Sequence, residues 1–281
     1  MLNHLLIQNA VCAALVEDLG RAGDITSQAI IPTTKQASAV IAARKAGVLC
    51  GIAFAETAFR LAEPALKVSI LKLDGEVLRE GEVVCRISGP ARGLLSTERV
   101  ALNYLGHLSG IASLTAKFVA EVAHTKARIA DTRKTTPGLR AFQKYAVHCG
   151  GGMNHRFGLD DAVLIKDNHI AVAGGVVPAL RAAKAAVGHL VKIEIEVDTL
   201  AQLSEVIAEG ADVVLLDNMS NDQLRSAVAL VGGQMLCEAS GNISITTVRA
   251  IAETGVDIIS SGALTHSASN LDLGLDITFD L

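Results

Sequence analysis

Aromatic side chains are scarce in this chain: tryptophan is absent, and only two tyrosines and six phenylalanines occur among 281 residues. Proteins that bind single-stranded nucleic acid stack bases on aromatic rings, so we expect no nucleic-acid partner. Half of the residues are nevertheless hydrophobic, chiefly the aliphatic types. This composition is typical of an α/β protein, because buried parallel strands are rich in branched side chains.

Long apolar runs and paired cysteine motifs are also missing. The five cysteines are scattered, odd in number and free of any C-x-x-C spacing, which favours reduced thiols over a disulfide framework or a zinc site. The first twenty residues lack a basic leader and indicate an amphipathic helix instead of a signal peptide. No apolar run reaches membrane-spanning length. We therefore expect a cytoplasmic protein with no membrane partner.

The first part of the chain, up to about residue 110, contains short apolar runs separated by turn residues. Asp74-Gly75 and Glu80-Gly81 are hairpin-like signals between β-rich segments. A long helical pattern follows, with Ser96 as its expected N-cap. These features predict an α+β domain that a long helix joins to the rest of the chain.

From about residue 126 onward the sequence alternates between strand-like and helical segments. The strand-like segments are 127–132, 162–168, 191–198, 212–218, 234–241 and 257–262. The last four recur at a spacing of about 20 residues, which fits one strand and one helix per repeat, so parallel strands in a (β/α) barrel are expected. An open doubly wound sheet is the alternative, but no G-x-G-x-x-G motif follows a strand.

Polar side chains stand at the carboxyl ends of four of these strands. Because side chains alternate along a strand, Glu194 and Glu196 share one face, and Asp217 continues the inward face of the next strand. The same parity applies to Lys166 and Ser240. Barrel active sites are assembled from carboxyl strand ends, so these side chains are expected to meet at one mouth.

The segment from Asp131 to Arg156 is strongly basic although the whole chain has a net charge of -4. It carries five cations against one acid: Arg133, Lys134, Arg140, Lys144 and Arg156 against Asp131. Arginine forks and lysine point charges suit carboxylate and phosphate oxygens. A compact cluster of this kind predicts a pocket for a small, highly charged anion, although a bare T-R-K tripeptide also occurs on solvated loops.

Several motifs in the same order and spacing make the chain resemble the quinolinate phosphoribosyltransferase family. They are TRKTTPGLR, GGGMNHR, LIKDNH, EIEVDT, LLDNM and EASGN, with EDLGRAGDITS, ERVALNYLGHLSGIAS and DIISSGALTHS outside the central region. The resemblance implies an incomplete TIM-like (β/α) barrel at 111–267 and an N-terminal α+β sandwich domain at 1–110, to which residues 268–281 return. It implies transfer of phosphoribose from phosphoribosyl pyrophosphate to quinolinate, with loss of pyrophosphate and carbon dioxide, in NAD biosynthesis.

The resemblance also implies which residues bind quinolinate. Its two adjacent carboxylates would be anchored by Arg133, Arg156 and Lys166, with His155 as a further donor. Members of this family act as dimers, and Arg99 is expected to reach the site of the partner subunit.

The same resemblance implies Mg²⁺ and a catalytic set of Lys134, Lys166, Glu196 and Asp217. Glu196 and Asp217 would contact the ribose hydroxyls and the metal ion, directly or through water, because Mg²⁺ prefers oxygen ligands. Taken alone, an acid at a strand end is equally compatible with a structural ion pair. Glu194 is expected to support Lys166 or Arg133.

Two small-residue loops are expected to hold the 5′-phosphate of the ribose. They comprise Ser240, Gly241 and Asn242 in one loop and Ser260 and Gly262 in the other. Backbone N–H groups before a helix make anion sites, although such loops are often ordinary caps. Either Asn168 or His169 could orient Lys166, and a plain packing histidine is an equal alternative.

Other functions remain open from the sequence. A related enzyme with the same fold and another substrate is one, but the joint presence of Arg133, His155 and Lys166 disfavours it. A Schiff-base lyase acting through Lys166 is another, disfavoured because nearby acids would keep the lysine charged. A third is a sensor that binds the same ligands without turnover.

Overall fold

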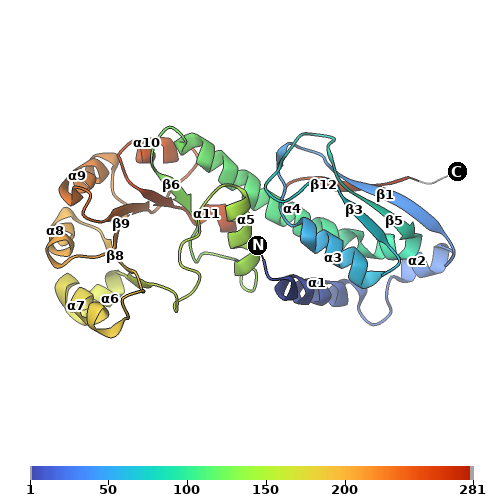
Figure 1. The fold of residues 1–281 in the computed structure, drawn as a ribbon, viewed down its shortest axis with the longest axis horizontal. Helices are drawn as coiled ribbons and strands as arrows, with labels where there is room; N and C mark the ends of the chain where they lie inside the picture. Colours follow the sequence, from blue (N-terminus) through green and yellow to red (C-terminus); the bar gives the residue numbers. More distant parts are fainter. Residues whose placement is uncertain (1, 279–281) are drawn as a thin grey trace. The chain divides into compact units, whose positions relative to one another are not determined.

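The structure, a computed structural model, describes residues 2–278 and divides into two compact units (Figure 1). Unit 1 comprises Met1–Leu114, Ala141–Gly151 and Ala268–Leu281, and unit 2 comprises Thr115–Arg140 and Gly152–Ser267. In the described part of the chain, no helix is long and apolar enough to cross a membrane.

Unit 1 is built on a four-stranded antiparallel sheet in the order β12-β1-β5-β3. Its strands are β1 (Gln36–Ala43), β3 (Lys67–Ile70), β5 (Val83–Pro90) and β12 (Leu273–Thr278), and a separate ribbon pairs β2 (Gly47–Val48) with β4 (Val77–Leu78). Its helical elements are α1 (His4–Leu19), α2 (Ile25–Ile30), α3 (Ile52–Ala62), the first part of α4 (Ala91–Val122) and most of α5 (Arg140–Cys149). The C-terminal strand therefore completes the N-terminal sheet.

Aromatic packing holds α5 in unit 1. Phe54 of α3 stacks on Tyr104 of α4, with ring centroids 4.7 Å apart, and meets Phe142 of α5 edge-on at 4.9 Å. Such ring pairs add to the hydrophobic gain of burial. The domain assignment from sequence placed this segment in the barrel, whereas the structure groups Ala141–Gly151 with unit 1.

Two expectations for this region are wrong in detail. The long helix begins at Ala91, so Ser96 is not its N-cap; the Ser96 hydroxyl donates to the carbonyl of Arg92 inside the helix. The two turns adopt positive φ at Gly75 and Gly81, but they do not close hairpins. Strand β4 pairs with β2 in the separate ribbon, and β3 pairs with β5 in the four-stranded sheet.

Unit 2 is a six-stranded parallel sheet in the order β6-β11-β10-β9-β8-β7. The strands are β6 (Arg128–Ala130), β7 (Val163–Ile165), β8 (Ile193–Val197), β9 (Val213–Asp217), β10 (Leu236–Ser240) and β11 (Ile258–Ser260). The helices are α6 (Asp167–Ala173), α7 (Val176–Ala186), α8 (Leu200–Glu209), α9 (Asn221–Val231), α10 (Val248–Ala252) and α11 (Ala263–His266). Among the described residues β6 and β7 do not pair with each other, so the barrel is incomplete, as expected.

Local sequence explains the strand–helix alternation of unit 2. Thr199 with Gln202 and Ser220 with Gln223 form capping boxes that start α8 and α9 directly after their strands. Ile195 on β8 is fully buried, in agreement with an apolar face turned toward the surrounding helices. Figure 1 shows α7, α8 and α9 along one side of the strands, which leaves the carboxyl strand ends to loops.

Candidate active site

A cavity of about 620 Å³ lies at the carboxyl ends of the unit 2 strands. Every substrate-binding residue expected from the sequence lines it except Arg99: Arg133, Lys134, His155, Arg156, Lys166, Glu196, Asp217, Ser240, Gly241, Asn242, Ser260 and Gly262. Arg99 is exposed on α4 in unit 1, and its role stays a prediction. Strand parity accounts for Lys166, Glu196, Asp217 and Ser240, and the structure brings these together with the positions that the family resemblance implied.

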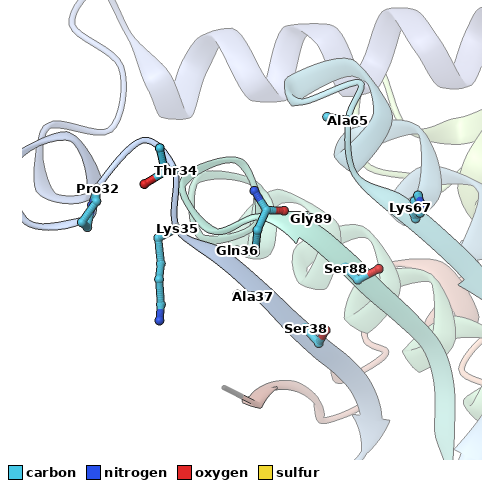
Figure 2. A pocket seen from close by; sticks show the side chains of 10 residues that line it. All are labelled: Pro32, Thr34, Lys35, Gln36, Ala37, Ser38, Ala65, Lys67, Ser88 and Gly89. Carbon is cyan, nitrogen blue, oxygen red and sulfur yellow. The ribbon is translucent and has the colours of Figure 1, made fainter. Parts of the chain in front are cut away.

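Another hollow, of about 550 Å³, lies on the sheet of unit 1 (Figure 2). Lys67 and Ser88 face each other there on β3 and β5, and Lys35 and Gln36 line it near the start of β1. Its lining contains no acid and no histidine. It therefore offers no group for acid–base chemistry near neutral pH, and the unit 2 cavity is the better candidate.

Lys166 and Glu196 form the central ion pair of the cavity. Strands β7 and β8 are parallel neighbours, and Leu164 stands opposite Glu194. Two residues further along each segment, Lys166 therefore lies opposite Glu196. The Nζ–Oε2 distance is 2.7 Å, with Glu196 buried and Lys166 half-exposed. His169 does not orient the lysine side chain; its Nδ1 accepts a hydrogen bond from the backbone N–H of Lys166 and thereby caps α6.

Three further cations lie in the cavity without a carboxylate partner. Within the described part of the chain no acid lies at ion-pair distance from Arg133, Lys134 or Arg156. Burial, and secondarily the charge of Arg133, lowers the pKa of Arg156. The Nε of Arg156 is buried and has no hydrogen-bond partner. Clustered guanidinium groups without an ion-pair partner suit a ligand that carries two negative charges.

The other two cations of the basic segment, Arg140 and Lys144, do not line the cavity. Arg140 donates to the hydroxyl of Thr135 and to the carbonyl groups of Arg133 and Phe157, so it fixes the backbone of two loops. Lys144 is buried within α5 and does not line the cavity. The anion pocket is therefore smaller than the basic segment suggests.

A buried acidic layer lies beneath the cations. His155 Nε2 is 2.9 Å from Glu194 Oε2 and 3.7 Å from Glu238 Oε1. Burial, and then the charge of Glu194, raises the pKa of Glu238 to about 7. The expectation that Glu194 supports Lys166 or Arg133 is wrong, because its hydrogen-bond partner is His155. A protonated Glu238 relieves the repulsion between the two carboxyl groups.

Asp131 fixes the segment that carries His155. The carboxylate is fully buried and accepts hydrogen bonds from Asn154 Nδ2 at 2.6 Å and from the backbone N–H of His155 at 3.0 Å. The backbone N–H of Arg156 in turn donates to His155 Nδ1. One buried acid therefore fixes the backbone that carries His155, a residue that lines the cavity.

Two asparagines shape the loop after β10. Asn218 and Asn242 both have positive φ, near 50°, which is uncommon outside glycine. Asn242 donates to Asn218 Oδ1, and Asn218 donates to Asp217 Oδ2. A Cβ on Gly241 would collide with the Asn218 side chain. Asn218 was not expected from the sequence, although its place directly after Asp217 at a strand end was a usable signal.

Residues at the C-terminal end of the barrel fix the position of Lys134. Its carbonyl accepts a hydrogen bond from the Thr265 hydroxyl at 2.7 Å, and its side chain passes close to Gly262, where a Cβ would leave too little room. His266 also lines the cavity next to Gly262 and was missed by the sequence analysis. It stands in the four-residue helix α11, directly after the small-residue loop that was expected to precede a helix.

Comparison with known proteins assigns both parts of the chain to one family. The family models that match are "Quinolinate phosphoribosyl transferase, C-terminal domain" over residues 111–276 and "Quinolinate phosphoribosyl transferase, N-terminal domain" over residues 24–109. The chain is 44% identical over 277 residues to the "Probable nicotinate-nucleotide pyrophosphorylase [carboxylating]" of Bacillus subtilis, covering 99% of this chain and 95% of that protein. It is 43% identical to the corresponding enzyme of Mycobacterium leprae, with 96% of each chain covered.

Solved structures agree with this assignment. The nicotinate-nucleotide pyrophosphorylase from Francisella tularensis superposes with a TM-score of 0.95 at 38% identity and covers 99% of this chain and 98% of that chain. NadC from Streptococcus pyogenes gives the same TM-score and the same coverage at 42% identity. The likeness extends over both units.

The acidic layer predicts how stability depends on pH. Because the folded protein holds the Glu238 proton more tightly than the unfolded chain does, this group favours folding fully below its ordinary pKa of 4.5, and the benefit disappears as pH rises through about 7. Glu238→Gln retains a donor without titrating. Between pH 5 and pH 8 the unfolding free energy of the variant should therefore fall by roughly 1 to 3 kcal/mol less than that of the wild type, measured by urea denaturation.

Glu205→Gln, at an exposed helix position, is the matched control and should leave the pH profile unchanged. Equal pH slopes for wild type and Glu238→Gln would contradict the assignment of a proton to this carboxyl group.

Proposed function

Because the chain belongs to the quinolinate phosphoribosyltransferase family, we propose that it forms nicotinate mononucleotide, pyrophosphate and carbon dioxide from quinolinate and phosphoribosyl pyrophosphate in NAD biosynthesis. The observation that carries this proposal is the set of three cations without carboxylate partners at the carboxyl strand ends: Arg133, Lys134 and Arg156. Both substrates are small, highly charged anions, and this is the chemistry that such a cluster suits.

Quinolinate binds through its two adjacent carboxylates. Arg133 and Arg156 supply guanidinium donors, and Lys166 supplies a point charge. Both ring nitrogens of His155 are engaged, Nε2 with Glu194 and Nδ1 with the Arg156 N–H, so this side chain fixes the backbone of Arg156 beside the substrate. The three cations hold the carboxylates together against their mutual repulsion. They also fix the ring nitrogen toward the sugar carbon that it attacks, which lowers the entropic part of the barrier.

The phosphoribosyl donor lies across the neighbouring strand ends. The loop Ser240–Asn242 and the turn Ser260–Gly262 present backbone N–H groups to the 5′-phosphate. Glu196 and Asp217 accept hydrogen bonds from the ribose hydroxyls. As the bond from C1′ to pyrophosphate breaks, their negative charge stabilises the cationic sugar, and Lys134 stabilises the departing phosphate oxygens.

The donor set of the cavity fits Mg²⁺. Asp217 Oδ2 accepts a hydrogen bond from Asn218, and Glu196 Oε2 accepts one from Lys166. Mg²⁺ requires only one or two carboxylates because it retains waters and takes substrate phosphate oxygens as ligands. When bound, the ion would neutralise charge on the leaving pyrophosphate.

Loss of carbon dioxide needs no covalent nucleophile from the protein. Attachment of ribose makes the ring nitrogen cationic, and this charge stabilises the carbanion left when the adjacent carboxylate departs. A Schiff base at Lys166 is disfavoured, because its Nζ is held in an ion pair with Glu196 Oε2. The cations therefore bind and orient the dianion throughout.

Replacement of Arg133 tests the anchoring role. We expect Arg133→Ala to lower kcat/KM for quinolinate at least about 10²-fold, on the scale of removing one preorganised charge-stabilising donor. Arg133→Lys should retain part of the activity, because the charge remains while the fork is lost. Arg225→Ala on the outer helix α9 is the control. Near-wild-type kinetics for Arg133→Ala would refute the assignment.

We also propose that the protein works as a homodimer in which Arg99 contributes to the partner's site. Arg99 is an exposed cation on α4 of unit 1, and the cavity is lined by residues of unit 2. A shared site is consistent with the resemblance of the surrounding ERVALNYLGHLSGIAS segment to this family.

Subunit mixing tests this arrangement. Arg99→Ala and Glu196→Ala protomers should each be inactive, and exchange of subunits should restore activity, up to about a quarter of wild type, because half of the chains enter mixed dimers with one intact site each. Absence of recovery, despite subunit exchange demonstrated by native mass spectrometry, would show that each site is self-contained.

Finally, we propose a cytoplasmic location. All five cysteines are free thiols, as a reducing compartment favours. Cell fractionation that recovers the protein with secreted or organellar markers would overturn this proposal.

A further inference from the structure

A second cluster of reactive side chains lies in unit 1, outside the cavity. It joins Cys50, next to α3, with Asp74 from the turn before β4 and Cys149 at the end of α5. The two sulfur atoms and a carboxylate oxygen lie within 4.8 Å of one another. Tyr145 donates to Asp74 Oδ2 at 3.0 Å, one helical turn before Cys149. The function proposed above uses none of these groups.

The two thiols differ in access. Cys50 is fully buried, and its backbone is fixed on both sides by the Ser109 hydroxyl, which accepts from its N–H at 2.9 Å and donates to its carbonyl at 3.1 Å. Cys149 is partly exposed. A small oxidant from solvent therefore reaches Cys149 first, while Cys50 is held directly beside it.

The surroundings also separate the two thiols electrostatically. A hydrogen bond from the Cys50 thiol is the largest influence on Cys149 and lowers its pKa. Burial raises the pKa of Cys50 well above its ordinary value. The thiolate, which is the reactive form, is thus favoured at the accessible cysteine.

A metal ion is a poorer occupant of this cluster. Both oxygens of Asp74 already accept hydrogen bonds, Oδ1 from the backbone N–H of Ile52 and Oδ2 from Tyr145. Burial raises the pKa of Asp74, so its charged form is disfavoured. Structural zinc takes four ligands, and the cluster offers three, with one of them occupied.

We propose that Cys149 and Cys50 form a peroxide-sensitive thiol pair, in which Cys149 is the site of modification and Cys50 resolves it into a disulfide. The Cys149 thiolate attacks one oxygen of hydrogen peroxide; the O–O bond breaks, and the hydroxide that leaves takes up a proton as water. The Cys50 sulfur then attacks the resulting sulfenic acid; the S–O bond breaks, and a second water leaves with the Cys50 proton. Two thiols are oxidised by two electrons, and one peroxide is reduced to two waters.

Peroxide titration of the reduced full-length protein tests the proposal. Peptide mapping without reductant should find one Cys50–Cys149 cross-link, reversed by dithiothreitol, at an oxidation rate at least about tenfold above that of the exposed but isolated Cys12. Cys50→Ser should leave a sulfenic acid on Cys149 that dimedone traps. Cys12→Ser is the matched control and should form the cross-link unchanged.

Three outcomes would overturn the proposal. One is oxidation of Cys12 as fast as that of Cys149 in the wild-type protein. Another is direct conversion of Cys149 to a sulfinic acid without a cross-link. The third is stoichiometric zinc binding that is lost in Cys149→Ser, which would assign the cluster to a metal. The wild-type measurement decides the first two even if a cysteine variant fails to fold.

Discussion

The site depends on keeping positive charges together before any substrate anion arrives. Arg133, Lys134 and Arg156 face one cavity without carboxylate partners, which is unfavourable by itself because like charges repel. Buried acids offset this without filling the pocket: Asp131 fixes the backbone beneath His155, and Glu194 holds the imidazole. The protein therefore stabilises the frame that carries the cations and leaves their charges without an ion-pair partner.

The parallel sheet makes this balance possible. Strands β7 to β10 end at one edge, so residues about 20 to 30 positions apart in sequence become neighbours, as the Lys166–Glu196 pair shows at 2.7 Å. The sheet sets the distances by backbone pairing, and short capped helices return the chain after each strand. Charge stabilisation in the proposed reaction then needs little reorganisation, because the donors are already in place.

Strand periodicity was sufficient to predict the strand-end part of the cavity, because alternation along a strand decides which side chains point inward. It placed Lys166, Glu196, Asp217 and Ser240 correctly at one mouth. The basic part, with Arg133 and Arg156, was expected from the charge of its segment and from the family resemblance. Pairings between side chains were harder to predict from sequence. Glu194 was expected to support a cation, but the tertiary position of residues 152–156 places His155 within hydrogen-bond distance of Glu194. The place of α5 in unit 1 was also missed, because Phe142 packs on Phe54, a contact that local sequence does not reveal.

Direct comparison of quinolinate with nicotinate as the acceptor tests the central claim most sharply. The two acids differ by the second carboxylate, which is the group that the paired arginines and Lys166 are proposed to hold. With phosphoribosyl pyrophosphate and Mg²⁺, the account predicts nicotinate mononucleotide and carbon dioxide in equal amounts from quinolinate and no product from nicotinate. Equal turnover of nicotinate, or no turnover of either acid by folded protein, would contradict it.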